Sequence, residues 1–157
     1  MAVAVGAQAP DLSLQDQHGR TVRLSDHRAR GDRPGSPVLL VFYPHAFSGT
    51  CTGELQELRD RAAAFDEAGA QVLGCSVDSL YAQRAFAEQE GFGFPLLADF
   101  WPHGAAARAF GVLDEERGRA VRGTFLVDRA GILRWSVVNP VHEARDTDAY
   151  LKALARL

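Results

Sequence analysis

Cys51 ends the stretch Val-Phe-Tyr-Pro-His-Ala-Phe-Ser-Gly-Thr-Cys, which begins at Val41. An apolar run at 38–42 opens this stretch, and apolar residues at helical spacing follow it. The pattern predicts a buried strand, a short loop and a helix whose first turn contains Cys51. The backbone N–H groups of a first turn have no intrahelical acceptor and carry partial positive charge. A thiolate, the nucleophilic form of cysteine, is therefore favoured over the thiol at this position.

Cys75 is the other cysteine of the chain, and it lies in the apolar run Val-Leu-Gly-Cys-Ser-Val, which predicts a buried strand. Two cysteines do not make a disulfide framework, and neither has the spacing of a Cys-x-x-Cys motif or a zinc site. A disulfide from an inner strand to Cys51 would demand local unfolding. We interpret Cys75 as a core residue, and we expect neither a metal nor a bound cofactor.

Length and composition predict one globular domain that spans residues 1–157. Of these residues, 46% are hydrophobic and 24% are charged, which is typical of a soluble protein. The net charge of −3 argues against nucleic acid as a partner. No apolar stretch approaches the ~20 residues that a membrane helix needs, and the first ten residues lack the pattern of a signal peptide. We expect a cytoplasmic protein that does not bind membranes.

Strands and helices alternate along the chain, and an antiparallel pair follows them. This order predicts an α/β, thioredoxin-like fold, with a mixed central β-sheet, helices on both faces and an N-terminal β-hairpin. Ser79 is a candidate N-cap, and Pro102 is expected at the first position of a helix that ends at Gly111. The predicted strands are 11–17 and 20–26, which form the hairpin, then 38–42, 71–77, 94–99, 121–128 and 132–138. The predicted helices run from Cys51 to near Gly69, over 80–90, over 102–110 and over 146–157, the last with Leu151, Leu154 and Leu157 on one side.

The segment from Pro44 to Cys51 resembles the peroxiredoxin motif Pro-x-x-x-(Thr/Ser)-x-x-Cys, whose cysteine is the peroxidatic thiol. The segment Arg-Gly-Thr-Phe-Leu-Val-Asp, which begins at Arg122, resembles the strand that supplies an active-site arginine in that family. Further segments follow the family's order and spacing over essentially the whole chain. Phe-Tyr-Pro-His-Ala-Phe-Ser-Gly-Thr-Cys-Thr-Gly-Glu-Leu and Leu-Leu-Ala-Asp-Phe-Trp-Pro-His-Gly are most similar to the alkyl hydroperoxide reductase E type of one-cysteine peroxiredoxin, found in actinobacteria.

The resemblance implies that Cys51 attacks a peroxide oxygen and that nearby groups stabilise the thiolate and the departing oxygen. The backbone N–H groups of Thr50 and Cys51 would point at the peroxide oxygens. Arg122 would reach both sulfur and oxygen with its fork of donors. Ser48 would donate to the thiolate or accept from the peroxide O–H. Pro44 would keep bulk water off the sulfenic acid.

Glu54 matches an acidic position of the family and is expected to have a supporting role; the alternative is that it only complements the helix dipole. His45 is expected to be exposed or at a subunit contact rather than to act as a base. His103 and His142 are expected to be structural or surface residues. Four aromatic residues are expected to line the peroxide pocket, to pack at a dimer interface or to fill the core: Tyr43, Phe47, Phe100 and Trp101.

No resolving cysteine occurs where the family places one, so the sequence predicts a sulfenic acid that an external thiol reduces. By resemblance, this thiol is mycothiol with a mycoredoxin, or another low-molecular-weight thiol with a glutaredoxin-like or thioredoxin-like reductant. The resemblance also implies a homodimer. Three alternatives stay open at this point: a two-cysteine mechanism that uses Cys75, a thiol–disulfide exchange protein, and a peroxide sensor.

Overall fold

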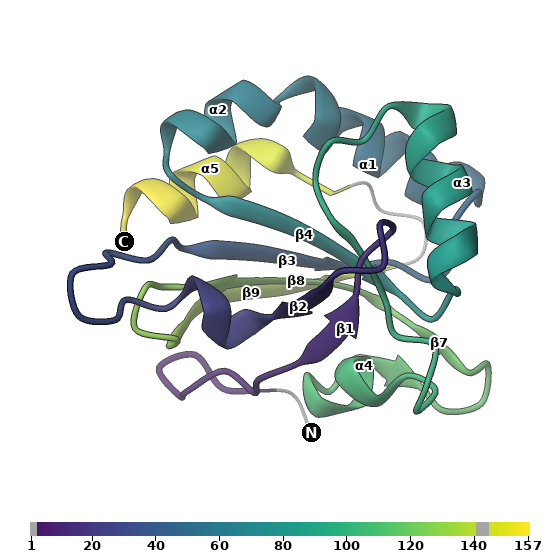
Figure 1. Ribbon diagram of the computed structural model, residues 1–157, viewed down its shortest axis with the longest axis horizontal. Coiled ribbons are helices and arrows are strands. Elements are labelled where there is room, and N and C mark those ends of the chain that lie inside the picture. The colour runs from purple at the N-terminus through teal and green to yellow at the C-terminus, as the bar shows by residue number, and fades with distance from the viewer. Residues whose placement is uncertain (1–2, 141–144) are drawn as a thin grey trace.

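The main sheet of the computed structural model is mixed, and its strands follow the order β2-β1-β5-β4-β3-β8-β9 (Figure 1). The structure describes residues 3–140 and 145–157. The strands of the sheet are β1 (Ser13–Gln15), β2 (Thr21–Arg23), β3 (Val38–Phe42), β4 (Gln71–Ser76), β5 (Leu96–Ala98), β8 (Arg122–Val127) and β9 (Leu133–Asn139). A separate ladder joins β6 (Leu113–Asp114) to β7 (Arg119–Ala120). The helices are η1 (Leu24–His27), α1 (Gly49–Asp60), α2 (Ala62–Glu67), α3 (Leu80–Glu90), α4 (Ala105–Ala109) and α5 (Thr147–Ala155).

Strand direction brings distant segments to one edge of the sheet. Strands β3, β4 and β5 are parallel, so their carboxyl ends meet at this edge. Strand β8 is antiparallel to β3, and β9 is antiparallel to β8. The first residue of β8 and the last residues of β9 therefore lie at the edge where β3 ends and the chain enters α1.

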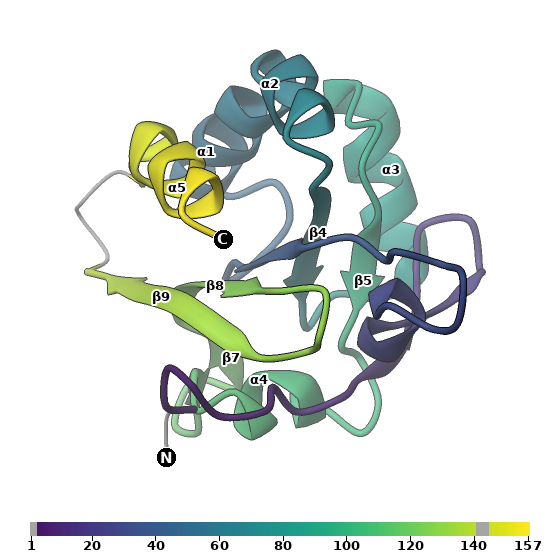
Figure 2. The ribbon, with the colours of Figure 1, turned by 90° about the vertical axis from the view of Figure 1, so that its left-hand side faces the viewer.

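Helices cover both faces of the sheet, as the sequence predicts. Helices α1, α2, α3 and α5 lie on one face, and α4 lies on the other (Figure 2). The side chains of β3 alternate between two buried clusters, with Leu39 and Val41 in one and Leu40 and Phe42 in the other. This two-sided burial explains why the run at 38–42 is continuously apolar.

The structure confirms several local predictions. Strands β1 and β2 pair as the N-terminal hairpin, and β8 pairs with β9. The Ser79 side chain accepts a hydrogen bond from the N–H of Ala82 at 3.2 Å and so caps α3. Gly91 ends the same helix with a φ of 71°, in the left-handed region that favours glycine.

The helix predicted over 102–110 is shorter than expected, and Pro102 is not its first residue. Helix α4 begins at Ala105, after a turn that contains a cis Trp101–Pro102 peptide bond. The buried carboxylate of Asp99 accepts hydrogen bonds from the N–H groups of Ala106 and Ala107, at 3.0 and 2.9 Å. Because Asp99, which follows β5, caps these N–H groups, α4 begins after Pro102 rather than at it.

Two further helix predictions are wrong in part. The helix expected from Cys51 to Gly69 is divided at Arg61, whose backbone leaves helical geometry with φ −105° and ψ 16°. The Arg61 guanidinium instead donates to Asp148 at the start of α5, at 2.5 Å. Helix α5 ends at Ala155, so Leu157 lies beyond it and is half-exposed rather than on its buried side.

Two glycines near the site differ in the space around them. A methyl group at Gly74 of β4 would lie 2.8 Å from Leu96 and 3.3 Å from Tyr43, whereas one at Gly53 of α1 would meet nothing within 4 Å. We expect Gly74→Ala to lower the free energy of unfolding by about 1–3 kcal/mol through overpacking. The matched variant Gly53→Ala should raise it by about 0.5–1 kcal/mol, because alanine favours the helix. Urea denaturation measures both, and equal effects would contradict the packing described.

Candidate active site

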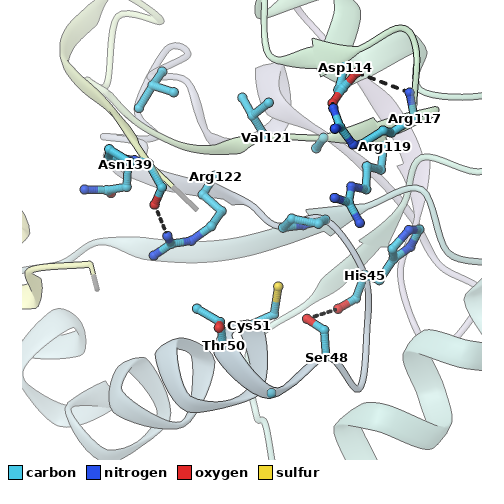
Figure 3. A pocket seen from close by; sticks show the side chains of 15 residues that line it. His45, Ser48, Thr50, Cys51, Asp114, Arg117, Arg119, Val121, Arg122 and Asn139 are labelled. Atoms are coloured by element: carbon cyan, nitrogen blue, oxygen red, sulfur yellow. Dashed lines mark hydrogen bonds and ion pairs between the residues drawn. The ribbon is translucent and has the colours of Figure 1, made fainter. Parts of the chain in front are cut away.

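A cleft of about 760 Å³ lies at the edge where β3, β8 and β9 meet (Figure 3). The loop after β3 contributes Pro44, His45 and Ser48 to its lining, and the first turn of α1 contributes Gly49, Thr50 and Cys51. The opposite wall consists of Asp114, Arg117, Arg119, Ala120, Val121, Arg122, Val138, Asn139 and Pro140. The residues predicted from the Pro44–Cys51 motif thus share one cleft with Arg122.

Cys51 lies in the first turn of α1, as the sequence predicts, and its side chain points toward the cleft (Figure 3). The residue is only 3% exposed. Ser48 occupies the N-cap position, but its side chain does not cap the helix. Its hydroxyl donates to the carbonyl oxygen of His45 at 3.1 Å. The N–H groups of the first turn, including those of Thr50 and Cys51, are therefore left without a side-chain cap beside the thiol.

A chain of buried and partly buried polar contacts holds the loop between β3 and α1. The N–H of Ala46 donates to the carboxylate of Asp78 at 2.8 Å, and the Ser76 hydroxyl donates to the same carboxylate at 2.5 Å. The side chain of Gln83 bonds to Ser76 at 2.9 Å and accepts from the Tyr43 hydroxyl at 2.5 Å. These contacts link the loop to β4 and α3, so the position of the first turn of α1 does not depend on the loop alone.

Glu54 is buried between two arginines. Its carboxylate forms an ion pair with Arg122 at 2.6 Å and a second ion pair with Arg145. All three side chains are at most 7% exposed. Arg122 also donates to the carbonyl oxygen of Pro140 (Figure 3). We call Glu54, Arg122 and Arg145 the ion triad. Glu54 therefore does more than complement a helix dipole.

Arg145 is a residue that the sequence motifs did not indicate. Its guanidinium donates to the hydroxyl of Thr124 at 2.8 Å and to the carbonyl oxygens of Gly123 and Phe42. The β3–β8 ladder ends at the pair Val41–Thr124, so Arg145 binds the backbone where the two strands separate. It lies just before α5, in a segment with no strand or helix pattern, and only its burial in the folded chain reveals its contacts.

Arg122 belongs to both the ion triad and the lining of the cleft, and the first turn of α1 lines the same cleft. A guanidinium group and the N–H groups of a helix N-terminus both attract negative charge. Cys51 therefore lies in a cleft that two positively polarised features border.

Cys75 lies on the other side of the sheet from Cys51. Its side chain belongs to the buried cluster with Phe42 and Phe110, whereas Cys51 belongs to the cluster with Leu55 and Leu58. Cys75 is fully buried, and burial raises the pKa of its thiol well above the usual value, with a further contribution from the charge of Asp99. It therefore remains a protonated, inaccessible thiol at neutral pH.

The histidines do not form a catalytic group with Cys51 in the described residues. His45 lines the cleft, and its Nδ1 lies 3.9 Å from Asp78. The His103 ring contacts the carbonyl oxygen of Gly118 at 2.5 Å, so it is a structural residue, as expected. His142 lies outside the described residues.

The aromatic residues divide between core and surface. Tyr43 is buried, and Phe47 packs on Phe86 with ring centroids 5.0 Å apart but remains 48% exposed. Phe100 and Trp101 are exposed, and neither lines the cleft.

Neither a metal site nor a membrane span is found in the part of the chain that the structure describes. No group of three or more His, Cys, Asp or Glu side chains there could hold a metal ion. None of the described helices is long and apolar enough to cross a membrane.

A cysteine in the first turn of a helix, on a mixed sheet of thioredoxin-like architecture and across a cleft from a buried arginine, is the arrangement of a peroxiredoxin. The comparisons agree: the chain belongs to the AhpC/TSA family, whose model matches residues 5–136. It is a peroxidase of the peroxiredoxin class, and the thioredoxin-like fold predicted from the sequence is confirmed.

Individual relatives cover nearly the full length of the chain. Alkyl hydroperoxide reductase E of Mycobacterium tuberculosis is 47% identical over 153 residues, which are 98% of this chain and 97% of that protein. Thioredoxin peroxidase of Echinococcus granulosus is 36% identical and covers 98% of this chain and 81% of its own. The crystal structure of peroxidoxin BcpB from Mycobacterium tuberculosis matches with a TM-score of 0.85 and 33% identity, over 98% of this chain and 97% of that one.

Glu54 provides a test of the ion triad. We expect Glu54→Gln to lower the free energy of unfolding by about 3–5 kcal/mol, because it leaves two buried guanidinium groups without their shared counter-charge. The control Glu57→Gln removes an exposed charge on the same helix and keeps the oxygen that accepts from Thr147 at 2.6 Å. Its effect should stay within about 0.5 kcal/mol. Denaturation curves that coincide for the two variants would contradict a structural role of the triad.

Proposed function

We propose that the protein is a one-cysteine peroxiredoxin that reduces hydrogen peroxide, organic hydroperoxides or peroxynitrite through a sulfenic acid on Cys51. An external thiol then regenerates the enzyme. The observation that carries this proposal is the placement of the two cysteines. Cys51 lies in an uncapped first turn beside the cleft and the ion triad, whereas Cys75 is buried on the opposite face of the sheet.

The first step is a displacement at oxygen. The Cys51 thiolate attacks the terminal oxygen of the hydroperoxide, so an S–O bond forms and the O–O bond breaks. The thiolate becomes a sulfenic acid, and the departing oxygen takes up a proton and leaves as an alcohol or water. Negative charge moves from sulfur to that oxygen, and the guanidinium of Arg122 and the N–H groups of Thr50 and Cys51 stabilise it in the transition state.

Ser48 and Pro44 complete the cradle. The Ser48 hydroxyl donates its hydrogen bond to the His45 carbonyl oxygen, and its oxygen lone pairs remain available to accept a hydrogen bond from the peroxide O–H. This geometry favours the acceptor role over donation to the thiolate. Pro44 lines the cleft, offers no N–H and limits access of water to the sulfenic acid.

The second step needs an external reductant. A thiol attacks the sulfenic sulfur, releases water and leaves a mixed disulfide, which a second thiol resolves to regenerate Cys51. Separation of the two cysteines by the sheet argues against the two-cysteine alternative. The similarity to alkyl hydroperoxide reductase E favours mycothiol with a mycoredoxin, or another low-molecular-weight thiol with a glutaredoxin-like or thioredoxin-like partner. The free state of both cysteines fits a reducing compartment, and we infer the cytoplasm.

Two replacements and a mass measurement test this mechanism. We expect Cys51→Ser to abolish peroxide consumption and Cys75→Ser to retain it, since only Cys51 has access to the cleft. One equivalent of peroxide without added thiol should add the mass of one oxygen to the wild-type chain. Loss of two hydrogens would instead indicate a Cys51–Cys75 disulfide, and the proposal would fail. Stable mixed disulfides with one protein and slow turnover would favour a sensor.

We also propose that the protein is a homodimer. Four exposed aromatic residues support this proposal, because all of them follow the carboxyl ends of the neighbouring strands β3, β4 and β5: Phe47, Tyr81, Phe100 and Trp101. Apolar side chains exposed together at one edge are typical of a contact surface.

Replacement of one of these aromatic residues tests the dimer. We expect sedimentation at micromolar concentration to give twice the chain mass for the wild type, and Trp101→Glu to shift it toward the monomer by placing a charge in the contact. Val5→Glu, a control at another exposed apolar residue, should leave the dimer intact. A wild-type monomer at all concentrations would contradict the proposal.

A further inference from the structure

The cleft beside Cys51 is much larger than hydrogen peroxide requires. Its volume of about 760 Å³ falls in the range of pockets that hold organic ligands of moderate size. Pro44, Val121, Val138 and Pro140 give it apolar walls. The Val138 side chain is 53% exposed although it is apolar. These walls suit the hydrocarbon part of an organic hydroperoxide.

Arg119 extends from β7 into this cleft. Its side chain is half-buried, and its guanidinium points toward the side of the cleft that contains His45 (Figure 3). No hydrogen bond or ion pair joins the Arg119 guanidinium to any other residue that the structure describes. A cation that is partly withdrawn from water and lacks a counter-charge favours an anion from outside the chain.

The nearest candidate for an internal partner is already engaged. Asp114 lies directly opposite Arg119 in the β6–β7 ladder. Its carboxylate instead accepts from the N–H groups of Glu116 and Arg117, at 3.1 and 3.2 Å, and pairs with the Arg117 guanidinium at 3.0 Å (Figure 3). Hydrogen bonds from Arg117 lower the pKa of Asp114, so the carboxylate is ionised at neutral pH and stays with the turn.

Arg117 and Asp114 neutralise each other. Arg119 remains as a positive charge on the wall of the cleft, in a chain whose net charge is −3. The cationic character of this surface is therefore local rather than a property of the whole protein.

We propose that Arg119 binds the carboxylate of an organic hydroperoxide whose –OOH group reacts with Cys51. This inference rests on the proposed peroxidase function and names a substrate class for it. The planar guanidinium offers two parallel N–H donors to a carboxylate, and the apolar walls hold the body of the substrate. Binding energy from this remote group orients the –OOH group for in-line attack.

Linoleic acid hydroperoxide and its methyl ester are matched probes for this site, since they differ only in the negative charge. Stopped-flow measurement would give the second-order rate constant for oxidation of the reduced protein by each, below the concentration at which either forms micelles. We expect the wild type to prefer the acid by about tenfold, the value of one charge-assisted hydrogen-bonded pair at a partly exposed site. Arg119→Gln should bring the acid-to-ester ratio close to one, and Arg119→Lys should keep part of the preference.

Arg108→Gln is the matched control. It removes the same charge at an exposed arginine that pairs with Glu115 and does not line the cleft, so the acid-to-ester ratio should stay at the wild-type value. An equal fall of this ratio in both variants would assign the preference to net charge and overturn the proposal. A wild-type ratio near one would also overturn it. Failure of the proposed peroxidase function would give a different result from failure of this substrate assignment, because Cys51→Ser would then still consume peroxide.

The same anion-binding group could serve the reductant instead. Reduction of the sulfenic acid by 3-mercaptopropionate and by its methyl ester separates this possibility from the oxidation step. We expect Arg119→Gln to change the acid-to-ester ratio only for the hydroperoxides. A change confined to the thiol pair would overturn the assignment to the hydroperoxide and give the site to an anionic reductant.

Discussion

The ion pairs of Glu54 with two buried arginines are the contacts on which the remaining architecture of the site depends. They join α1, the first residue of β8 and Arg145 just before α5, three segments that are far apart in the sequence. Arg145 extends the connection to the carbonyl oxygens of Phe42 and Gly123, where the β3–β8 ladder has just ended. One carboxylate thus fixes the helix that carries the thiol relative to the strand that carries Arg122.

Burial of three charges has a large desolvation cost, and well-packed apolar side chains would stabilise the same region at least as well. The triad does something that an apolar cluster would not do, because it holds the Arg122 guanidinium at the wall of the cleft. This guanidinium and the N–H groups of the first turn of α1 border the same cleft as Cys51. The Ser48 hydroxyl donates to the His45 carbonyl oxygen and does not cap α1. The first turn therefore keeps N–H donors for a bound anion that a side-chain cap would occupy.

Local sequence patterns predicted most of the fold and the position of Cys51 in the first turn of a helix. The run at 38–42 and the helical spacing after Cys51 indicate a strand and a helix without knowledge of any contact. Arg145 could not be found in this way, because its partners come from β3, β8 and α1 and no local pattern marks it. The start of α4 was misplaced for a similar reason, since Asp99 of a preceding segment supplies the cap.

Charge is arranged at two depths in the cleft, with different structural consequences. The inner charges lie on α1, on β8 and just before α5, where they join these segments, so a change in any of them alters the fold and the chemistry together. The outer charge, Arg119, belongs to the short β6–β7 ladder, whose turn already satisfies Asp114. A residue at this position can change without disturbing the ion triad. Substrate preference can therefore vary at the rim of the cleft while the geometry around Cys51 stays constant.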